Sequence, residues 1–176
     1  MKDHIVVGDR ILLDASFSAA RARLEILASD GMLPWASEVA YGEGITGLVK
    51  AAGPAAGLTR LAAVRLDDLA ETHDRAHIAL HWEAIAADGK LFTALDADLM
   101  LAPAEDQITA LALAGAYRPQ PGRGGAGLDQ AIVRECATAA VRSFLARVGC
   151  VLAHPAGTAG PAGHSPPRRP LSEDKL

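Results

Sequence analysis

The chain has 176 residues, the length of one domain with a sizeable buried core. Half of the residues are hydrophobic but only 4% are aromatic, so the core must be built mainly from alanine, leucine, valine and isoleucine. The net charge of −4 and the isoelectric point near 5.8 provide no strongly basic surface. We therefore expect the protein to bind neither nucleic acid nor an anionic membrane.

The first third of the chain predicts a strand followed by one or two helices. Residues 4–16 are rich in β-branched and aliphatic side chains and predict the strand. Ser16 or Ser18 can then cap a helix that stops at Asp30-Gly31. Residues 34–50 leave two alternatives open, because their proline favours the start of a helix while their glycines also suit a strand with a bulge. The apolar positions of the first helix include Ala20, Leu24 and Leu27.

The middle of the chain predicts an antiparallel meander. Apolar residues alternate with a period close to two, as in a strand that buries one face. Turn-type clusters such as Asp88-Gly89 separate the apolar segments, and short turns between short strands imply antiparallel neighbours. The four predicted strands are 58–69, 76–87, 90–101 and 107–117.

The last third predicts a long helix and then a disordered tail. Helical periodicity runs from about Ala126 to Leu152 and gives a broad apolar face. Residues 153–176 are rich in proline, glycine and alanine and lack the apolar surface needed to fold. The glycines of 122–127 match a dinucleotide-binding motif, but that motif needs a parallel βαβ unit, so we interpret them as a linker.

The two cysteines and the N-terminus indicate the compartment. Cys136 and Cys150 fall in the same predicted helix, about 21 Å apart at the helical rise, which is too far for a disulfide. We expect both to be packed thiols in a reducing compartment. The sequence has neither a signal-peptide pattern nor an apolar run of bilayer length, so we expect a cytoplasmic protein without a membrane span.

The Asp88-Gly89 turn also predicts a strand register. A two-residue turn there places Trp82 opposite Leu95, and continues with apolar pairs along one buried face. A five-residue loop over 102–106 then places Leu101 opposite Gln107. The opposite, outer face carries His77, His81, Asp96 and Asp98.

That outer face has three interpretations. Two imidazoles and two carboxylates can bind a metal ion or perform acid–base chemistry. We favour instead a solvated strand face with an ordinary cross-strand pair between His81 and Asp96, and we predict no metal site. The flat alanines of 110–116 on the same face also suit a partner, and a homodimer is the candidate partner complex.

The element order, together with the segments "LHWEA", "LFTALDADLML" and "ALAGAYRPQ", resembles the START-like helix-grip superfamily, which includes polyketide cyclases and lipid-transfer domains. The resemblance covers residues 4 to about 152. It implies an α+β fold in which a curved antiparallel sheet wraps around a long C-terminal helix. It also implies one domain over 1–152 and a cavity for an apolar ligand between sheet and helix. The superfamily has no common catalytic motif, so the resemblance assigns no catalytic residues and no cofactor.

We therefore predict that the protein binds an apolar small molecule, such as a lipid or a polyketide-like compound, without chemistry. An enzyme of the cyclase or aromatase type and an interaction module are the alternatives, and a fully packed core is the structural alternative to a cavity. The residues predicted to line the cavity are Trp35, Tyr41, Leu80, Trp82, Leu95, Leu111, Leu113, Tyr117, Leu128, Ile132, Cys136 and Ala139.

Overall fold

The computed structural model describes residues 4–52, 60–86, 88–119 and 130–154. The predicted linker at 122–127, the candidate site residue Leu128 and most of the predicted tail lie outside these ranges. The elements in chain order are β1 (Ile5–Asp14), α1 (Phe17–Ser29), α2 (Met32–Ala52), β2 (Arg60–Leu66), β3 (Ala70–Glu71), β4 (Ala76–Ile85), β5 (Leu91–Glu105), β6 (Ile108–Pro119) and α3 (Gln130–Ala153).

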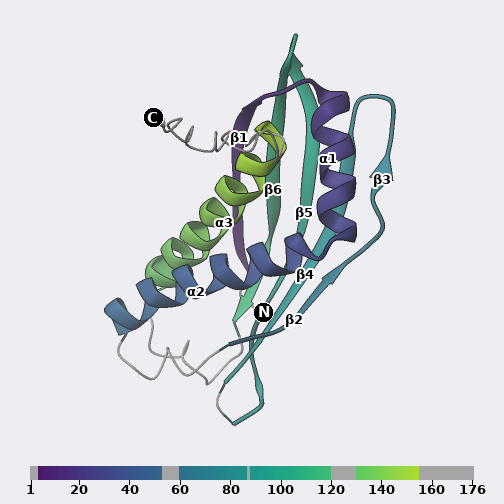
Figure 1. Cartoon of the computed structure of the whole chain (residues 1–176). Helices are drawn as coiled ribbons and strands as arrows, with labels where there is room; N and C mark the ends of the chain where they lie inside the picture. The colour runs from purple at the N-terminus through teal and green to yellow at the C-terminus, as the bar shows by residue number, and fades with distance from the viewer. Residues whose placement is uncertain (1–3, 53–59, 87, 120–129, 155–176) are drawn as a thin grey trace, which may run out of the picture.

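The strands form one open antiparallel sheet, and the helices cover one of its faces (Figure 1). The strand order is β1-β6-β5-β4-β2, with the short β3 also paired to β4. Helix α3 packs along β1 and β6, and α2 crosses it on the same side (Figure 1). The predicted α+β class, with an antiparallel sheet and a long C-terminal helix against it, is confirmed.

Helix α1 follows its sequence signals closely. The Ser16 hydroxyl accepts a hydrogen bond from the backbone N–H of Ala19, which identifies Ser16 as the N-cap. The helix ends at Ser29, and Gly31 has a positive φ of 73° that favours glycine. Its buried residues are Ala20, Leu24 and Leu27, as the spacing predicts.

The ambiguous segment 34–50 is helical and forms most of α2. Its glycines therefore lie within a helix and not at a strand bulge. At least one of them, Gly44, allows α2 to pack closely against α3. A Cβ on Gly44 would lie 3.0 Å from the Ala140 Cβ and 3.0 Å from the Cys136 carbonyl oxygen. The small residues on α2 therefore shorten the distance between the two helices, at the known cost of glycine in a helix.

The β4–β5 pairing confirms the predicted register in the body of the hairpin. Trp82 lies opposite Leu95 and His81 opposite Asp96. The turn differs from the prediction: the Ala86 N–H donates to the Lys90 carbonyl at 2.9 Å, so the loop is one residue longer. A bulge beside Ile85 absorbs the extra residue and restores the register.

The predicted β5–β6 register is wrong by four residues. Leu101 lies opposite Leu111 and not Gln107, because β5 continues through the segment that was expected to be a loop. The chain turns only at Asp106-Gln107, where Gln107 has a φ of 61°. A shift of four is even, so every side chain keeps its predicted face.

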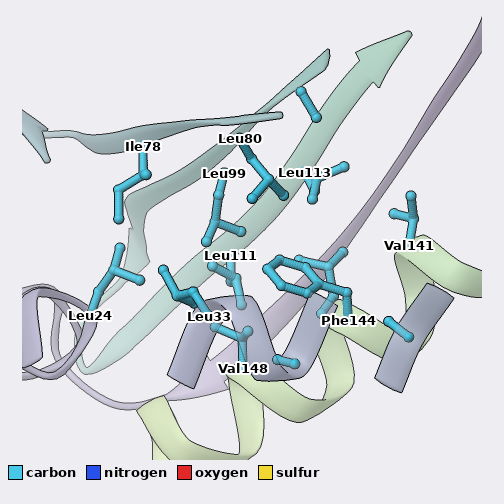
Figure 2. Close-up of a cluster of buried hydrophobic side chains, with 14 of the residues drawn as sticks. Leu24, Leu33, Ile78, Leu80, Leu99, Leu111, Leu113, Val141, Phe144 and Val148 are labelled. Carbon is cyan, nitrogen blue, oxygen red and sulfur yellow. The ribbon is translucent and has the colours of Figure 1, made fainter. Parts of the chain in front are cut away.

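The core fills the space between the sheet and all three helices. Figure 2 shows leucines of the sheet meeting Leu24 of α1, Leu33 of α2 and Phe144 of α3. The Trp82 and Phe144 rings meet edge to face, with centroids 5.7 Å apart at 78°. Helix α3 has the length of a membrane span, and an 18-residue window within Ala131–Ala153 has a mean hydropathy of 1.5, but here its apolar residues belong to the core of the fold.

Candidate ligand-binding site

A small gap remains at one end of the inner face of the sheet, under α2. Its position follows from the strand register: Trp82 lies opposite Leu95, and Leu95 lies opposite Tyr117. The gap is partly open to solvent, and its side chains pack so closely that they leave no room for a water molecule. Its walls come from α2 and four strands, and consist of Tyr41, Leu61, Trp82, Ala84, Thr93, Leu95 and Tyr117.

One polar atom in the wall residues has no hydrogen-bond partner. The Trp82 indole is 2% exposed, and its Nε1–H donates to no atom of the described residues. Thr93, which is also 2% exposed, donates its hydroxyl to the Arg118 carbonyl at 3.1 Å. A buried donor without an acceptor costs about 1–3 kcal/mol, so Trp82 is held in the core at the expense of stability.

The ionisable groups around the gap stay neutral near pH 7. Burial raises the pKa of the Tyr117 hydroxyl well above its ordinary range, and the neighbouring Tyr41 raises it further. Burial also raises the pKa of the Cys136 thiol, with a smaller contribution from Glu135. The described groups therefore offer hydrogen-bond donors in apolar surroundings.

The structure brings four of the predicted site residues together at the gap: Tyr41, Trp82, Leu95 and Tyr117. Leu80, Leu111 and Leu113 face inward as predicted, but they lie in the packed core beyond the gap (Figure 2). Trp35 is half exposed on α2 and is not among the residues that line the gap.

None of the described α3 residues predicted to face the ligand lines the gap. Ala139 is exposed, and Ile132 and Cys136 are only partly buried. The helix turns a different stripe, centred on Phe144 and Val148, toward the sheet. Cys136 instead lies toward α2, where its Sγ would be 3.5 Å from a Cβ on Gly47. Because α3 packs against both the sheet and α2, its apolar face is too broad for the sequence to identify the stripe that faces the sheet.

Three wall residues, Leu61, Ala84 and Thr93, are not among the residues predicted to line the cavity. Ala84 lies opposite Thr93 on the inner face, so the predicted β4–β5 register already placed it there. Leu61 lies opposite Ala84 across the β2–β4 pairing, which carries a bulge next to Leu61. No local sequence signal gives that pairing, because β2 and β4 are separated by the irregular segment around β3.

The outer face of the sheet carries a chain of five charged or titratable side chains. His81 contacts Asp96 through Nδ1 and Glu83 through Nε2, the latter at 3.0 Å. Arg118 pairs with Asp96, and Arg65 pairs with Glu83. The His81 hydrogen bond is the main cause that lowers the pKa of Glu83, and Arg65 contributes.

This arrangement changes the interpretation of the predicted outer group. The His81–Asp96 pair is confirmed, whereas His77 lies opposite Met100 and no hydrogen bond or ion pair of the described residues joins it to Asp98. Two shallow grooves of about 480 and 490 Å³ adjoin at Asp98, over a floor of small residues. Within the described ranges, no group of three or more His, Cys, Asp or Glu side chains is arranged to hold a metal ion.

Comparisons with known proteins give only distant similarity. No protein-family model matches the chain. No curated protein matches it either.

Among solved structures, a conserved protein from Geobacillus kaustophilus is 12% identical, with a TM-score of 0.45 over 83% of this chain and 93% of that one. A hypothetical protein from Helicobacter pylori is 6% identical, with a TM-score of 0.41 over 84% and 89%. The Zhui aromatase/cyclase from Streptomyces sp. R1128 is 10% identical, with a TM-score of 0.36 over 85% and 96%. All three TM-scores are below 0.5, so no functional argument rests on these similarities.

Proposed function

We propose that this protein binds an apolar small molecule at the gap between α2 and the inner face of the sheet. The observation that carries the proposal is the Trp82 Nε1–H, a buried donor without a partner in a residue that lines the gap. A ligand oxygen that accepts this hydrogen bond would recover the free energy that the unpaired donor costs. We therefore infer a ligand with an apolar body and a carbonyl or similar acceptor.

The size of the gap limits how the ligand enters. Sites for drug-sized ligands usually enclose about 300–1,000 Å³, whereas this gap leaves no room even for a water molecule. A ligand of any size therefore requires Leu61 and Tyr117, which are only partly buried, to move outward and open the site.

The groups at the gap favour binding over catalysis. Burial raises the pKa values of Tyr117 and Cys136, so both remain neutral hydrogen-bonding groups in apolar surroundings. The Arg118 guanidinium pairs with Asp96 on the outer face, away from the gap. We propose on the same grounds that the relationship to the START-like superfamily is one of fold and ligand binding, not of cyclase chemistry.

The direct test uses the indole N–H as a reporter. The chain has two tryptophans, so Trp35→Phe leaves a single indole resonance, that of Trp82. Acetophenone and ethylbenzene are titrated separately into this variant and followed by proton–nitrogen correlation NMR. Both have a similar apolar body, but only acetophenone has an acceptor oxygen.

We expect both compounds to give saturable shifts, with acetophenone bound about fivefold tighter, since one satisfied hydrogen bond contributes about 1 kcal/mol. We also expect acetophenone to move the indole resonance further downfield. The proposal is wrong if neither compound shifts the Trp82 resonance saturably. Native mass spectrometry of freshly purified protein would in addition report any ligand retained from the cell.

A further inference from the structure

Strand β1 is an edge strand with a free side. It pairs with β6 along its whole length, and the sheet order places no described strand on its other side (Figure 1). Its ten residues, IVVGDRILLD, contain no proline or lysine, the residues that often prevent pairing at sheet edges. The free side therefore presents backbone N–H and C=O groups that another strand can pair with.

The outer face of β1 carries two large apolar side chains that are exposed. Val6 is 76% exposed and Leu12 is 62% exposed, and both point to the side of the sheet that no helix covers. They flank the middle of the strand symmetrically, three residues on each side of Asp9. The neighbouring β6 residues on this face, opposite Val6 and Leu12, are Ala116 and Ala110, which are too small to cover them.

We propose that β1 pairs antiparallel with β1 of a second copy of this chain, about a twofold axis at Asp9. In this register Val6 lies opposite the second copy's Leu12, and symmetry repeats the pair. On the inner face Ile5 lies opposite the second copy's Leu13. All the apolar side chains at the edge thus meet apolar partners, which is the self-complementarity that a twofold interface requires.

The two nearest registers that preserve the faces are less favourable. A shift of two residues in one direction places Arg10 opposite Arg10 of the second copy. A shift of two in the other direction leaves Leu12 opposite the exposed His4, outside the strand. Like charges directly opposite destabilise a strand pair, and unpaired apolar side chains gain nothing, so the register centred on Asp9 is preferred.

Asp9 itself faces its symmetry mate across the axis, on the inner side of the sheet. Its carboxylate accepts hydrogen bonds from the Arg10 backbone N–H and from Arg142 Nε, both at 2.8 Å. These two hydrogen bonds lower the pKa of Asp9, the backbone one most. The two Asp9–Arg142 pairs then form an alternating group of four charges at the axis, which offsets the repulsion between the carboxylates.

A cysteine pair tests the register. Val6→Cys and Leu12→Cys are combined in a chain whose native cysteines are replaced, Cys136 by alanine and Cys150 by serine. Within one chain the two new thiols are about 20 Å apart, at the rise of a strand, so they cannot form an internal disulfide. In the proposed dimer the thiol at position 6 of one copy lies opposite the thiol at position 12 of the other. Mild oxidation should therefore give a covalent dimer in high yield.

The single variants Val6→Cys and Leu12→Cys are the matched controls, because each places its only thiol opposite a residue without one. We expect little covalent dimer from either. Equal crosslinking of the single and double variants, or none in the double variant, overturns the proposal.

Sedimentation velocity gives an independent test on the uncrosslinked protein. We expect a dimer that dissociates on dilution, because one strand pair buries less than a standard interface. Leu12→Lys should shift the protein to monomer, while Ala114→Lys, an exposed outer position on β6, should not. Wild-type protein that stays monomeric at all concentrations overturns the edge pairing. The same holds for a dimer that only Ala114→Lys disrupts, since that indicates face-to-face stacking.

Discussion

At the scale of single residues, Trp82 combines a packing role with an unpaired polar atom. Its ring contacts Phe144 edge to face, and its Nε1–H is buried without a partner. A residue chosen only for packing would do better without that N–H, because the unpaired donor costs free energy. A ligand that carries a hydrogen-bond acceptor would pair with this N–H, and such a ligand would explain why an indole occupies the position.

The variant Trp82→Phe separates these two roles. We expect it to remove the roughly fivefold preference for acetophenone over ethylbenzene, because phenylalanine cannot donate the hydrogen bond. Binding of ethylbenzene itself should persist or improve, since the smaller ring enlarges the gap. Competition against a common aromatic probe, followed by ligand-observed NMR, measures both affinities. A preference that survives the substitution would assign the donor role to another group, such as Tyr117.

At the scale of secondary-structure elements, α2 packs closely against α3. Gly44 and Gly42 lie in the same helix but have different surroundings: a Cβ on Gly44 would meet α3 at 3.0 Å, and a Cβ on Gly42 would meet nothing within 4 Å. The two positions therefore form a matched pair.

We predict opposite effects of alanine at these two positions. Gly42→Ala should stabilise the protein by up to about 1 kcal/mol, the difference in helix propensity. Gly44→Ala should destabilise it by about 1–3 kcal/mol, because the added methyl group forces α2 and α3 apart. Urea denaturation measures both changes in the free energy of unfolding. Equal stabilisation by the two substitutions would contradict the close packing of these helices.

The same two helices are joined by an ionic contact. Glu43 of α2 accepts hydrogen bonds from Ser143 and Arg147 of α3, and these lower its pKa below the ordinary value of 4.5. A lowered pKa in the folded state means stabilisation that is fully present above that ordinary value and is lost as the pH falls through the lowered pKa.

We therefore expect Glu43→Gln to flatten the pH dependence of stability. The variant should be less stable than wild type near pH 7, and the difference should shrink as the pH falls below about 4. Thermal melts recorded from pH 7 to pH 3 provide the measurement. Parallel melting curves, with a constant difference at every pH, would mean that the carboxylate makes no ionisation-dependent contribution. Glu43 is exposed, so high salt should also reduce the difference.

At the scale of the whole molecule, local signals predicted most of the fold. The Ser16 cap and the spacing of Leu24 and Leu27 each depend on a few neighbouring residues, and both are confirmed. The chain also turns at Asp88-Gly89 as predicted, but in a longer loop. The β4–β5 register survived a turn one residue longer than expected, because a bulge compensates for it. The β5–β6 register did not survive, since nothing in the segment around Pro103 shows that the strand continues.

The candidate site was only partly predictable for a related reason. The inner-face residues Trp82, Leu95 and Tyr117 follow from strand alternation, which is a local property. The side of α3 that faces the sheet depends on where α2 packs against α3. The sequence left open whether the α2 segment was a helix or a strand. The size of the gap depends on how all these elements close together, and sequence patterns do not encode a volume. Ala139 was wrongly predicted to face the sheet because the packing of α2 against α3 was not known from the sequence.

The ligand gap and the β1 edge are separate features of one sheet. The gap lies on the inner face under α2, while the proposed dimer contact runs along the edge of β1, with side chains on both faces of the sheet. Variants at Leu12 should therefore leave ligand binding unchanged, which can be checked with the same NMR titration. Loss of binding in Leu12→Lys would mean that the two features are coupled.

The central claim, that a ligand occupies the gap, is tested most directly by filling it. Leu61 and Leu66 are both partly buried leucines of β2, but only Leu61 lines the gap. Leu61→Trp and Leu66→Trp therefore apply the same change at matched positions. The measurement is calorimetric titration of each variant with acetophenone, after circular dichroism has verified the fold. The account predicts that Leu61→Trp weakens binding at least tenfold and that Leu66→Trp retains wild-type affinity. Equal affinity in the two variants would show that the ligand binds elsewhere.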